Sequence, residues 1–485
     1  MRMNIHRALL TRLGVVAGSV VVAWFPFQAG AELPLPEQAA TAMHKAATFF
    51  RSKVASHGGY VYYYSLDLTQ RWGEGKATAE QIWVQPPGTP TVGLAYLRAC
   101  EATGDRFYLD AAREAAEALF YGQLASGGWT NAVDFHPAGK LVAQYRNGKG
   151  RGRNYSTLDD GISQGALRLI MHVDRALGFN NPEIHEASEF ARSALLAAQF
   201  PSGGFPQAWS GPVVPHSPQK ASYPEYDWRT ENRIKEYWDL PTLNDGLAGQ
   251  LARALLDGWE IYQDERCRDA VLRLGDFLLL AQMPEPQPGW AQQYDTKMRP
   301  AWARRFEPPA LASHESMDAL ETLLRVHRLT GETKYLDPFP GALAWLRRSL
   351  LPDGRFARFY ELQTNTPLYM TRDYQPTHSD ADLPEHYGWK VKSRLDRIEA
   401  ELADAKANAA APAPRKVKED KVREILSALD AEGRWISTNP EAGLAGNPKF
   451  KPGEPFIASE VFSKNLETLS SYVAGSRGVV LSVRH

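Results

Sequence analysis

Two short acidic segments of the sequence match each other. They are Thr157–Gly161, with the sequence TLDDG, and Thr242–Gly246, with the sequence TLNDG, and each one opens a stretch of helical periodicity. Asp is common at a helix start, where it can cap the first turn and interact favourably with the helix dipole. Carboxylates brought together from two such starts would also suit Ca²⁺, or an acid/base pair of a glycosidase. Asp159, Asp160 and Asp245 are therefore candidate metal ligands.

Four segments further along the chain are rich in aromatic, amide or arginine side chains. They occupy Gly289–Asp295, Pro300–Pro309, Ala357–Leu362 and Arg372-Asp373. A guanidinium group binds a carboxylate with two parallel hydrogen bonds, and aromatic rings stack on sugar faces, so the combination suits an anionic sugar. A surface network of arginines with acidic neighbours is the structural alternative.

An internal repeat predicts the elements that position these residues. A helical pattern ends six times in glycine followed closely by an aromatic residue, about every seventy residues, which is the length of a two-helix unit with its loops. The six turns are Gly58–Tyr60, Gly127–Trp129, Gly203–Phe205, Gly289-Trp290, Gly354–Phe356 and Gly433–Trp435. Helix pairs are expected at 91–103 and 108–123, 160–177 and 182–199, 245–263 and 265–282, and 316–330 and 338–350. Strand signals are sparse.

The unpaired helical patterns at the two ends suggest how the repeats are arranged. Residues 36–54 have no partner before them and residues 460–473 have none after them, so the two could pair and close a ring. We therefore predict an all-α fold, an α/α toroid of helix hairpins with long loops on one rim. Residues 129–158, 205–243 and 290–314 all connect a second helix to the next first helix, so they share that rim, and long loops on a rigid scaffold carry functional sites.

The N-terminus has the features of a secretory signal. Arg2, Arg7 and Arg12 precede or flank an apolar run at 13–25, and Ala29-Gly30-Ala31 is a small-residue cleavage motif. We predict a signal peptide at 1–31, a catalytic toroid at 32–395, a charged and Ala-Pro-rich linker at 396–418, and C-terminal helices at 419–485 that could close the toroid. The protein is thus expected to be secreted or periplasmic, without a stable membrane span once the signal is removed.

Composition narrows the partners. The formal net charge is −1 and no basic stripe is present, which argues against nucleic acid. Thirteen Trp and 20 Tyr supply rings that could stack on sugars, although core packing accounts for most buried aromatics.

Several of these segments, in this order, resemble the pectate lyases of polysaccharide lyase family ten. The similarity runs from about Thr157 to Asp373. It is carried by the two acidic starts, by Gly203–Gln207, by Gly289–Asp295, by Ala303–Glu307, and by Ala357–Tyr360 with Arg372-Asp373. The family fold is an α/α barrel. The resemblance implies a secreted enzyme that cleaves polygalacturonate by calcium-assisted β-elimination, and we expect it to be a monomer.

The resemblance also implies roles for individual residues. Asp159, Asp160 and Asp245 correspond to residues that bind calcium and the substrate carboxylate, and Arg304 corresponds to the base. The substrate-binding residues would be Arg358, Arg372, Gln207, Trp290, Gln293 and Tyr360.

Some positions depart from the family pattern. Asp160 and Gly246 stand where the family usually has Asn, His314 stands where it has Asp, and the segment Tyr226–Leu240 replaces a shorter loop. Two alternatives therefore stay open: a toroidal glycoside hydrolase acting on uronic-acid oligosaccharides through Asp160 and Asp245, and a non-catalytic polysaccharide-binding protein.

Overall fold

The computed structural model describes residues 33–407, 416–440, 444 and 448–483. The predicted signal peptide and the Ala-Pro stretch of the predicted linker lie outside these residues.

Four consecutive helix pairs form the centre of the molecule. The first helices are α2 (Thr89–Thr103), α4 (Ile162–Ala176), α6 (Leu247–Tyr262) and α8 (Ser313–Thr330). Each is followed by its partner, α3 (Arg106–Tyr121), α5 (Pro182–Ala197), α7 (Glu265–Ala281) or α9 (Phe339–Arg348). Helix α2 packs on α4, α4 on α6 and α6 on α8, while α3 packs on α5 and α5 on α7, which gives two curved layers. The predicted helix pairs are all present.

The turns within pairs are tight because their residues suit helix ends. Three of these helices are preceded by an N-cap residue whose side chain accepts hydrogen bonds from backbone N–H groups of the first turn: Asp105 before α3, Asn181 before α5 and Asp264 before α7. Helix α2 ends at Gly104, which has a positive φ of 75°.

The chain ends pack on the same array. Helix α1 (Leu35–Phe49) continues as a short π-helix, Phe50–Val54, and packs against α12 (Ser459–Arg477), which in turn packs against α2. The rings of Phe50 and Phe462 stack with centroids 3.8 Å apart in this contact. The predicted pairing of the first and last helices is therefore confirmed.

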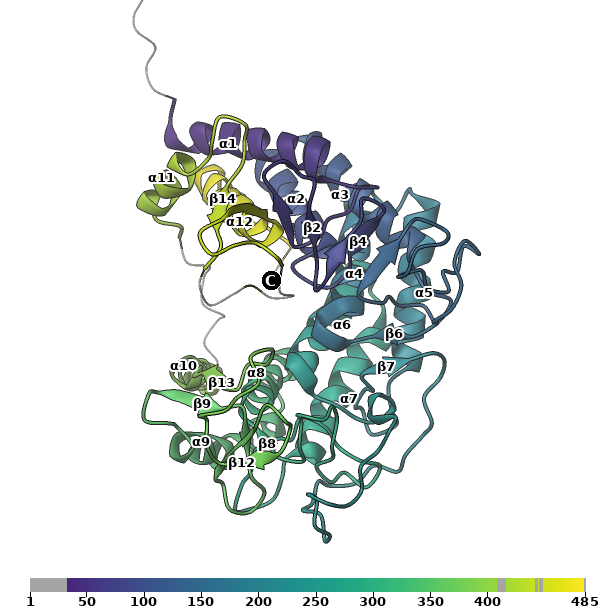
Figure 1. Cartoon of the computed structure of the whole chain (residues 1–485), viewed down its shortest axis with the longest axis vertical. Helices are drawn as coiled ribbons and strands as arrows, with labels where there is room; N and C mark the ends of the chain where they lie inside the picture. Colours follow the sequence, from purple (N-terminus) through teal and green to yellow (C-terminus); the bar gives the residue numbers. More distant parts are fainter. Residues whose placement is uncertain (1–32, 408–415, 441–443, 445–447, 484–485) are drawn as a thin grey trace, which may run out of the picture.

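The other end of the array carries α10 (Leu395–Lys406), which packs against α8 and α9, whereas α11 (Glu419–Ser427) packs against α1 and α12. Figure 1 shows the helices as a curved arc, with α9 and α10 at one end and α11 and α12 at the other.

Short antiparallel strands tie the loops together, so the fold is helix-rich but not purely helical. In the described part of the chain the sheets have the orders β14-β15-β1-β2-β3, β12-β11-β10-β8, β13-β9, β4-β5 and β6-β7. The strands are β1 Tyr63–Ser65, β2 Arg71–Trp72, β3 Lys76–Ala77, β4 Gln81–Trp83, β5 Ala132–Asp134, β6 Ser156–Thr157, β7 Ala208–Trp209, β8 Leu311–Ala312, β9 Arg355–Ala357, β10 Phe359–Tyr360, β11 Pro367–Met370, β12 Pro376–Thr377, β13 Lys390–Lys392, β14 Ile436–Thr438 and β15 Pro455–Ala458. The all-α prediction missed them because segments of two to four residues leave almost no periodic signal.

The repeated glycine-aromatic turns have a packing function. Gly203 has a φ of 94°, and a Cβ atom there would lie 1.9 Å from the carbonyl oxygen of Arg273. The aromatic residue then enters the core: the indole N–H groups of Trp129 and Trp290 donate to the backbone oxygens of Leu119 and Leu278 at 2.8 Å.

Among the described helices, none combines the length and the apolar character that a membrane crossing requires.

Candidate active site

The two acidic segments adopt the same backbone conformation. Each forms a 3₁₀ turn, Asp159–Gly161 before α4 and Asn244–Gly246 before α6. The preceding leucine is hydrogen-bonded to the next rim loop in both cases, from Leu158 N–H to the oxygen of Gln207 and from Leu243 N–H to the oxygen of Gln292, each at 2.8 Å. Neighbouring repeat units therefore place their acidic residues at equivalent positions on the same rim.

Helix capping does not account for Asp160 and Asp245. Helices α4 and α6 have no side-chain capping hydrogen bond, and their N-cap residues are Gly161 and Gly246. Both aspartates lie in the left-handed region, with φ of 48° and 52°. This conformation is unfavourable for a residue with a Cβ atom, and such residues concentrate at functional sites.

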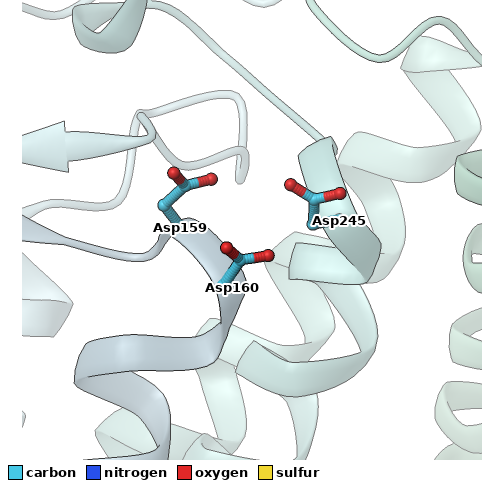
Figure 2. Close-up of side chains that lie close together, drawn as sticks. All are labelled: Asp159, Asp160 and Asp245. Carbon is cyan, nitrogen blue, oxygen red and sulfur yellow. The ribbon is translucent and has the colours of Figure 1, made fainter. Parts of the chain in front are cut away.

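The three predicted metal ligands lie together. Figure 2 shows the carboxylates of Asp159, Asp160 and Asp245 converging from the two helix starts. One carboxylate oxygen from each lies within 4.8 Å of the others. Asn244 Nδ2 donates to Asp159 Oδ1 at 2.9 Å, and Gln85 Nε2 donates to Asp160 Oδ2 at 2.8 Å, so two of the three carboxylates are also held in position by amides.

Burial and mutual repulsion make this cluster costly to ionise. Burial, partly offset by the positive charge of Arg304, raises the pKa of Asp159 to about 6. Burial, together with the charges of Asp245, Asp159 and Glu74, raises the pKa of Asp160 to about 7. A cation bound between these oxygens would remove the repulsion, so the cluster fits a hard divalent ion such as Ca²⁺.

Arg304 lies beside the acidic cluster and is held by Glu307. Its Nε and Nη2 atoms donate to the two carboxylate oxygens of Glu307 at 2.8 and 2.7 Å, and its backbone N–H donates to Glu307 Oε2 at 3.0 Å. Arg304 Nη2 also lies 3.8 Å from Asp245 Oδ2. Burial would lower the pKa of Arg304, but the hydrogen bonds and the charge of Glu307 outweigh burial and raise it.

Arg358 approaches the cluster from another direction. Its Nη2 atom donates to Asp245 Oδ1 at 2.7 Å and to Glu315 Oε1 at 3.2 Å. Glu315 is 1% exposed, and its second oxygen has no hydrogen-bond partner among the described residues. The guanidinium carbon of Arg358 lies 4.7 Å from the centre of the Tyr387 ring, and the Tyr387 hydroxyl donates to Glu307 at 3.0 Å. The two arginines are therefore joined through one network that faces the carboxylates.

The other predicted substrate-binding residues lie elsewhere. The Arg372 side chain is 64% exposed and pairs with Asp382 and Glu385, at 3.6 and 3.5 Å, rather than with the acidic cluster. Gln207 is buried next to Leu158, which its backbone oxygen binds. The remaining predicted residues are buried in the core, where each side chain donates a hydrogen bond to a backbone oxygen: Trp290, Gln293 and Tyr360. In this conformation the four buried residues, unlike Arg372, lie within the rim and present little surface to a sugar.

Several site residues were not predicted. Glu307 ends the segment Ala303–Glu307, and the spacing Arg304-x-x-Glu307 could have indicated its ion pair with Arg304. Glu315 follows His314 in the sequence, but nothing there pointed to its contact with Arg358. Tyr387 and Gln85 lie outside the stretch in which the sequence resembles a known family, and only the folded chain brings them to the rim.

The comparisons with known proteins agree with this geometry. Residues 123–356 match the model of the pectic acid lyase family. No curated protein sequence matches the chain.

Three solved structures are similar in arrangement. A family 10 polysaccharide lyase from Cellvibrio cellulosa, in a variant complexed with trigalacturonic acid, is 18% identical, covers 67% of this chain and 99% of its own, and has a TM-score of 0.46. The family 10 polysaccharide lyase from the same organism is 19% identical, with 65% and 97% coverage and a TM-score of 0.45. A D-mannose isomerase is 12% identical, with 92% and 100% coverage and a TM-score of 0.43.

The family match covers both acidic helix starts and Arg304, and it ends two residues before Arg358. The chain is therefore a polysaccharide lyase. Within that class, residues 123–356 form a pectic acid lyase domain, and the enzyme is a pectate lyase, which confirms the resemblance seen in the sequence.

Proposed function

We propose that the enzyme cleaves polygalacturonate by calcium-assisted β-elimination at the rim site. The observation that carries this proposal is the convergence of three carboxylates within 4.8 Å of one another, faced by Arg304 and Arg358. β-Elimination removes the proton next to a sugar carboxylate, and the negative charge that develops must be stabilised. Cations and cation-binding carboxylates around one position fit this requirement.

Asp159, Asp160 and Asp245 are the residues that would hold calcium. Bound there, calcium would neutralise a sugar carboxylate and so acidify the neighbouring C–H group. Carboxylate oxygens are the ligands that calcium prefers, and the mutual repulsion that contributes to the raised pKa values of Asp159 and Asp160 would be relieved by a cation. Affinity is expected to be weak without substrate, because sugar carboxylates complete the coordination shell.

Arg358 would orient the substrate. It lies against Asp245 and Glu315 and keeps a fixed direction, so it can offer its remaining N–H groups to a galacturonate carboxylate. Arg372 would act on a more distant sugar, from the exposed edge of the same group of loops. Its pairs with Asp382 and Glu385 are solvent-exposed and weak enough to exchange for a ligand carboxylate.

Arg304 would abstract the proton, and its contacts set a condition on that role. A base must be neutral, yet Glu307 binds the guanidinium with two hydrogen bonds and stabilises its charged form. Arg304 must therefore leave Glu307, or share its proton with it, before it can act. The alternative is that Arg304 stays charged and stabilises the developing anion.

Product analysis with and without calcium tests the proposal. Polygalacturonate incubated with the mature enzyme and Ca²⁺ should give unsaturated products that absorb in the ultraviolet, and excess chelator should abolish them. Asp245→Ala should lose most of this activity, whereas Asp110→Ala, which changes an acidic residue on the distant helix α3, should retain it. Full activity in chelator would rule out the calcium role.

A glycoside hydrolase remains a second candidate, since one observation favours it. The carboxylates lie about as close as the catalytic pair of a retaining glycosidase, and a carboxyl group with a pKa of about 7, as at Asp160, suits a general acid. A hydrolase would work in chelator and would form no double bond.

We also propose that the curved helical array is an α/α toroid and that the domain limits are 1–31, 32–395, 396–418 and 419–485. Residues 1–31 would be removed on export. N-terminal sequencing of enzyme from the host's envelope or medium should begin near Glu32, and intact Met1 in the cytoplasm would contradict this.

A further inference from the structure

A cavity opens on the rim beside Arg304. It has a volume of about 450 Å³ and is lined by residues 234, 235 and 237, by residues 303–306 and by Tyr374. Arg304 belongs both to this cavity and to the network around the acidic cluster, so the cavity continues directly from the site of chemistry.

Part of the positive charge at this cavity has no acidic partner among the described residues. Arg305 lines the cavity and Arg233 lies nearby, and neither has an ion pair within the described residues. Burial and the charge of Arg305 together lower the pKa of Arg233. The Lys235 side chain is 89% exposed, and its nearest acidic partner, Glu236, is 3.8 Å away. Arg305 and Arg233 have no acidic partner among the described residues and Lys235 has only the exposed Glu236, so positive charge is in excess here, which indicates a place for an anionic ligand.

Aromatic rings share the same cavity. The guanidinium carbon of Arg305 lies 4.9 Å from the centre of the Tyr374 ring, and the Phe306 and Tyr374 ring centroids are 5.8 Å apart. Tyr237 adds a third ring to the lining. Rings beside unpaired cations provide apolar surface for a sugar face and charge for its carboxylate.

The loop that supplies Lys235 and Tyr237 is anchored at several points. Gln293 Nε2 donates to the backbone oxygen of Tyr237 at 3.1 Å, and Trp238 Nε1 donates to the Tyr155 hydroxyl at 3.2 Å. Arg229 forms an ion pair with Glu361, which is 5% exposed. The loop is thus held against the rim, and Lys235 has a defined neighbourhood.

We propose that this cavity is an additional substrate subsite, which binds the carboxylate of a galacturonate unit away from the cleaved bond. Lys235 and Arg305 bind that carboxylate, and Tyr374 contacts the sugar ring. The enzyme therefore favours chains long enough to reach from the acidic cluster into the cavity. This inference rests on the proposed function, since it assumes a polyuronate substrate.

The test compares short and long substrates. Lys235→Ala, Arg305→Ala and the double variant are assayed on oligogalacturonates of three and six or more units, with calcium. The matched controls remove exposed charges elsewhere: Lys53→Ala in the π-helix Phe50–Val54, and Arg106→Ala at the start of α3. Because an exposed charge pair contributes about 0.2–1 kcal/mol, we expect KM for the long substrate to rise about two- to fivefold in each single variant and about tenfold in the double variant.

Trigalacturonate should be cleaved by all variants with KM within about twofold of the parent enzyme, if it occupies the central site alone. The difference on long chains should shrink at high salt, which screens exposed charges, and on methyl-esterified chains, which lack the carboxylate. Arg305→Lys should keep most of the preference for length. Variants that match the two controls on long chains, or that lose activity equally on short and long chains, would overturn the subsite.

Calorimetric binding separates this inference from the proposed function. If the parent enzyme forms no unsaturated product from any oligomer, the lyase proposal fails. The double variant should still bind long oligogalacturonate more weakly than the controls do, and equal binding by the double variant and the controls would overturn the subsite.

Discussion

Replacing Glu307 by Gln tests the role of Arg304, because it removes the charge that holds the guanidinium protonated. Both carboxylate oxygens of Glu307 accept hydrogen bonds from Arg304, and Glu307 is 2% exposed, so little solvent screens the pair. Glutamine has nearly the same shape and keeps one acceptor oxygen. The change therefore alters the charge next to Arg304 while disturbing the packing little.

The size of the effect follows from the hydrogen bonds. A hydrogen bond to a charged group contributes about 1.5–3 kcal/mol, and one pKa unit corresponds to about 1.4 kcal/mol. Losing the ionic partner should thus lower the pKa of Arg304 by about one to two units. A base acts in its deprotonated form, so activity rises as pH rises through its pKa. Because the pKa of Arg304 is raised, the assay follows the rising limb below it, where a lower pKa should increase kcat about ten- to hundredfold at each pH.

The assay is the pH dependence of kcat at saturating calcium and polygalacturonate, followed by ultraviolet absorbance. Asp295→Asn is the matched control, because Asp295 is also a buried partner of an arginine: Arg299 Nε and Nη2 both donate to Asp295 Oδ2, at 2.8 and 2.6 Å. It should leave the pH profile unmoved. If Glu307→Gln lowers activity equally at every pH, the base role is refuted and Arg304 acts as a fixed positive charge.

Three further predictions follow from the same site. Arg304→Ala should nearly abolish elimination, with a loss of about a hundredfold to ten-thousandfold in kcat, yet leave oligogalacturonate binding largely intact. Arg305→Ala should keep kcat on trigalacturonate. The reverse result would show that the wrong arginine has been assigned. Arg358→Lys should cost about 1–3 kcal/mol in kcat/KM, because Lys cannot reproduce the fork between Asp245, Glu315 and the substrate, and unchanged kinetics would remove Arg358 from the site. The pKa values of Asp159 and Asp160 are raised in the folded protein, so ionising these groups lowers the free energy of unfolding. This loss of stability is absent below their unfolded pKa of about 3.9, and it grows with pH until the pH exceeds the folded values of about 6 and about 7. Calcium should accordingly raise the melting temperature more at pH 8 than at pH 5, and Asp160→Asn should raise that of the chelator-treated enzyme at pH 8, where a fall in calorimetry would contradict the argument.

The repeat explains why much of this site could be predicted from sequence. Asp160 and Asp245 occupy equivalent places before α4 and α6, and Asp159 directly precedes Asp160, so stacking of adjacent hairpins brings the three side chains together. The conformation of Asp160 and Asp245 could not be predicted, because the left-handed region is uncommon for a residue with a Cβ atom, and the sequence suggested only that these aspartates could cap the helices.

Other features depend on contacts that no local pattern contains. Gln85 and Tyr387 reach the site from segments far from the matched region. Trp290 and Tyr360 have residue types that suit sugar binding, yet Trp290 fills the core at a glycine-aromatic turn and Tyr360 packs edge-on against Trp345 in the core. The short strands at the rim were missed because pairing with distant segments, rather than their own sequence, stabilises them.

The source of the oxygen at the new chain end tests the central claim most directly. The enzyme cleaves polygalacturonate in the presence of calcium in water enriched in ¹⁸O, and the masses of the products are measured by mass spectrometry. β-Elimination breaks the C4–O bond without adding water, so the account predicts unsaturated oligomers that carry no ¹⁸O from the cleavage. Saturated products, each with one ¹⁸O atom at the new reducing end, would show hydrolysis and would contradict it.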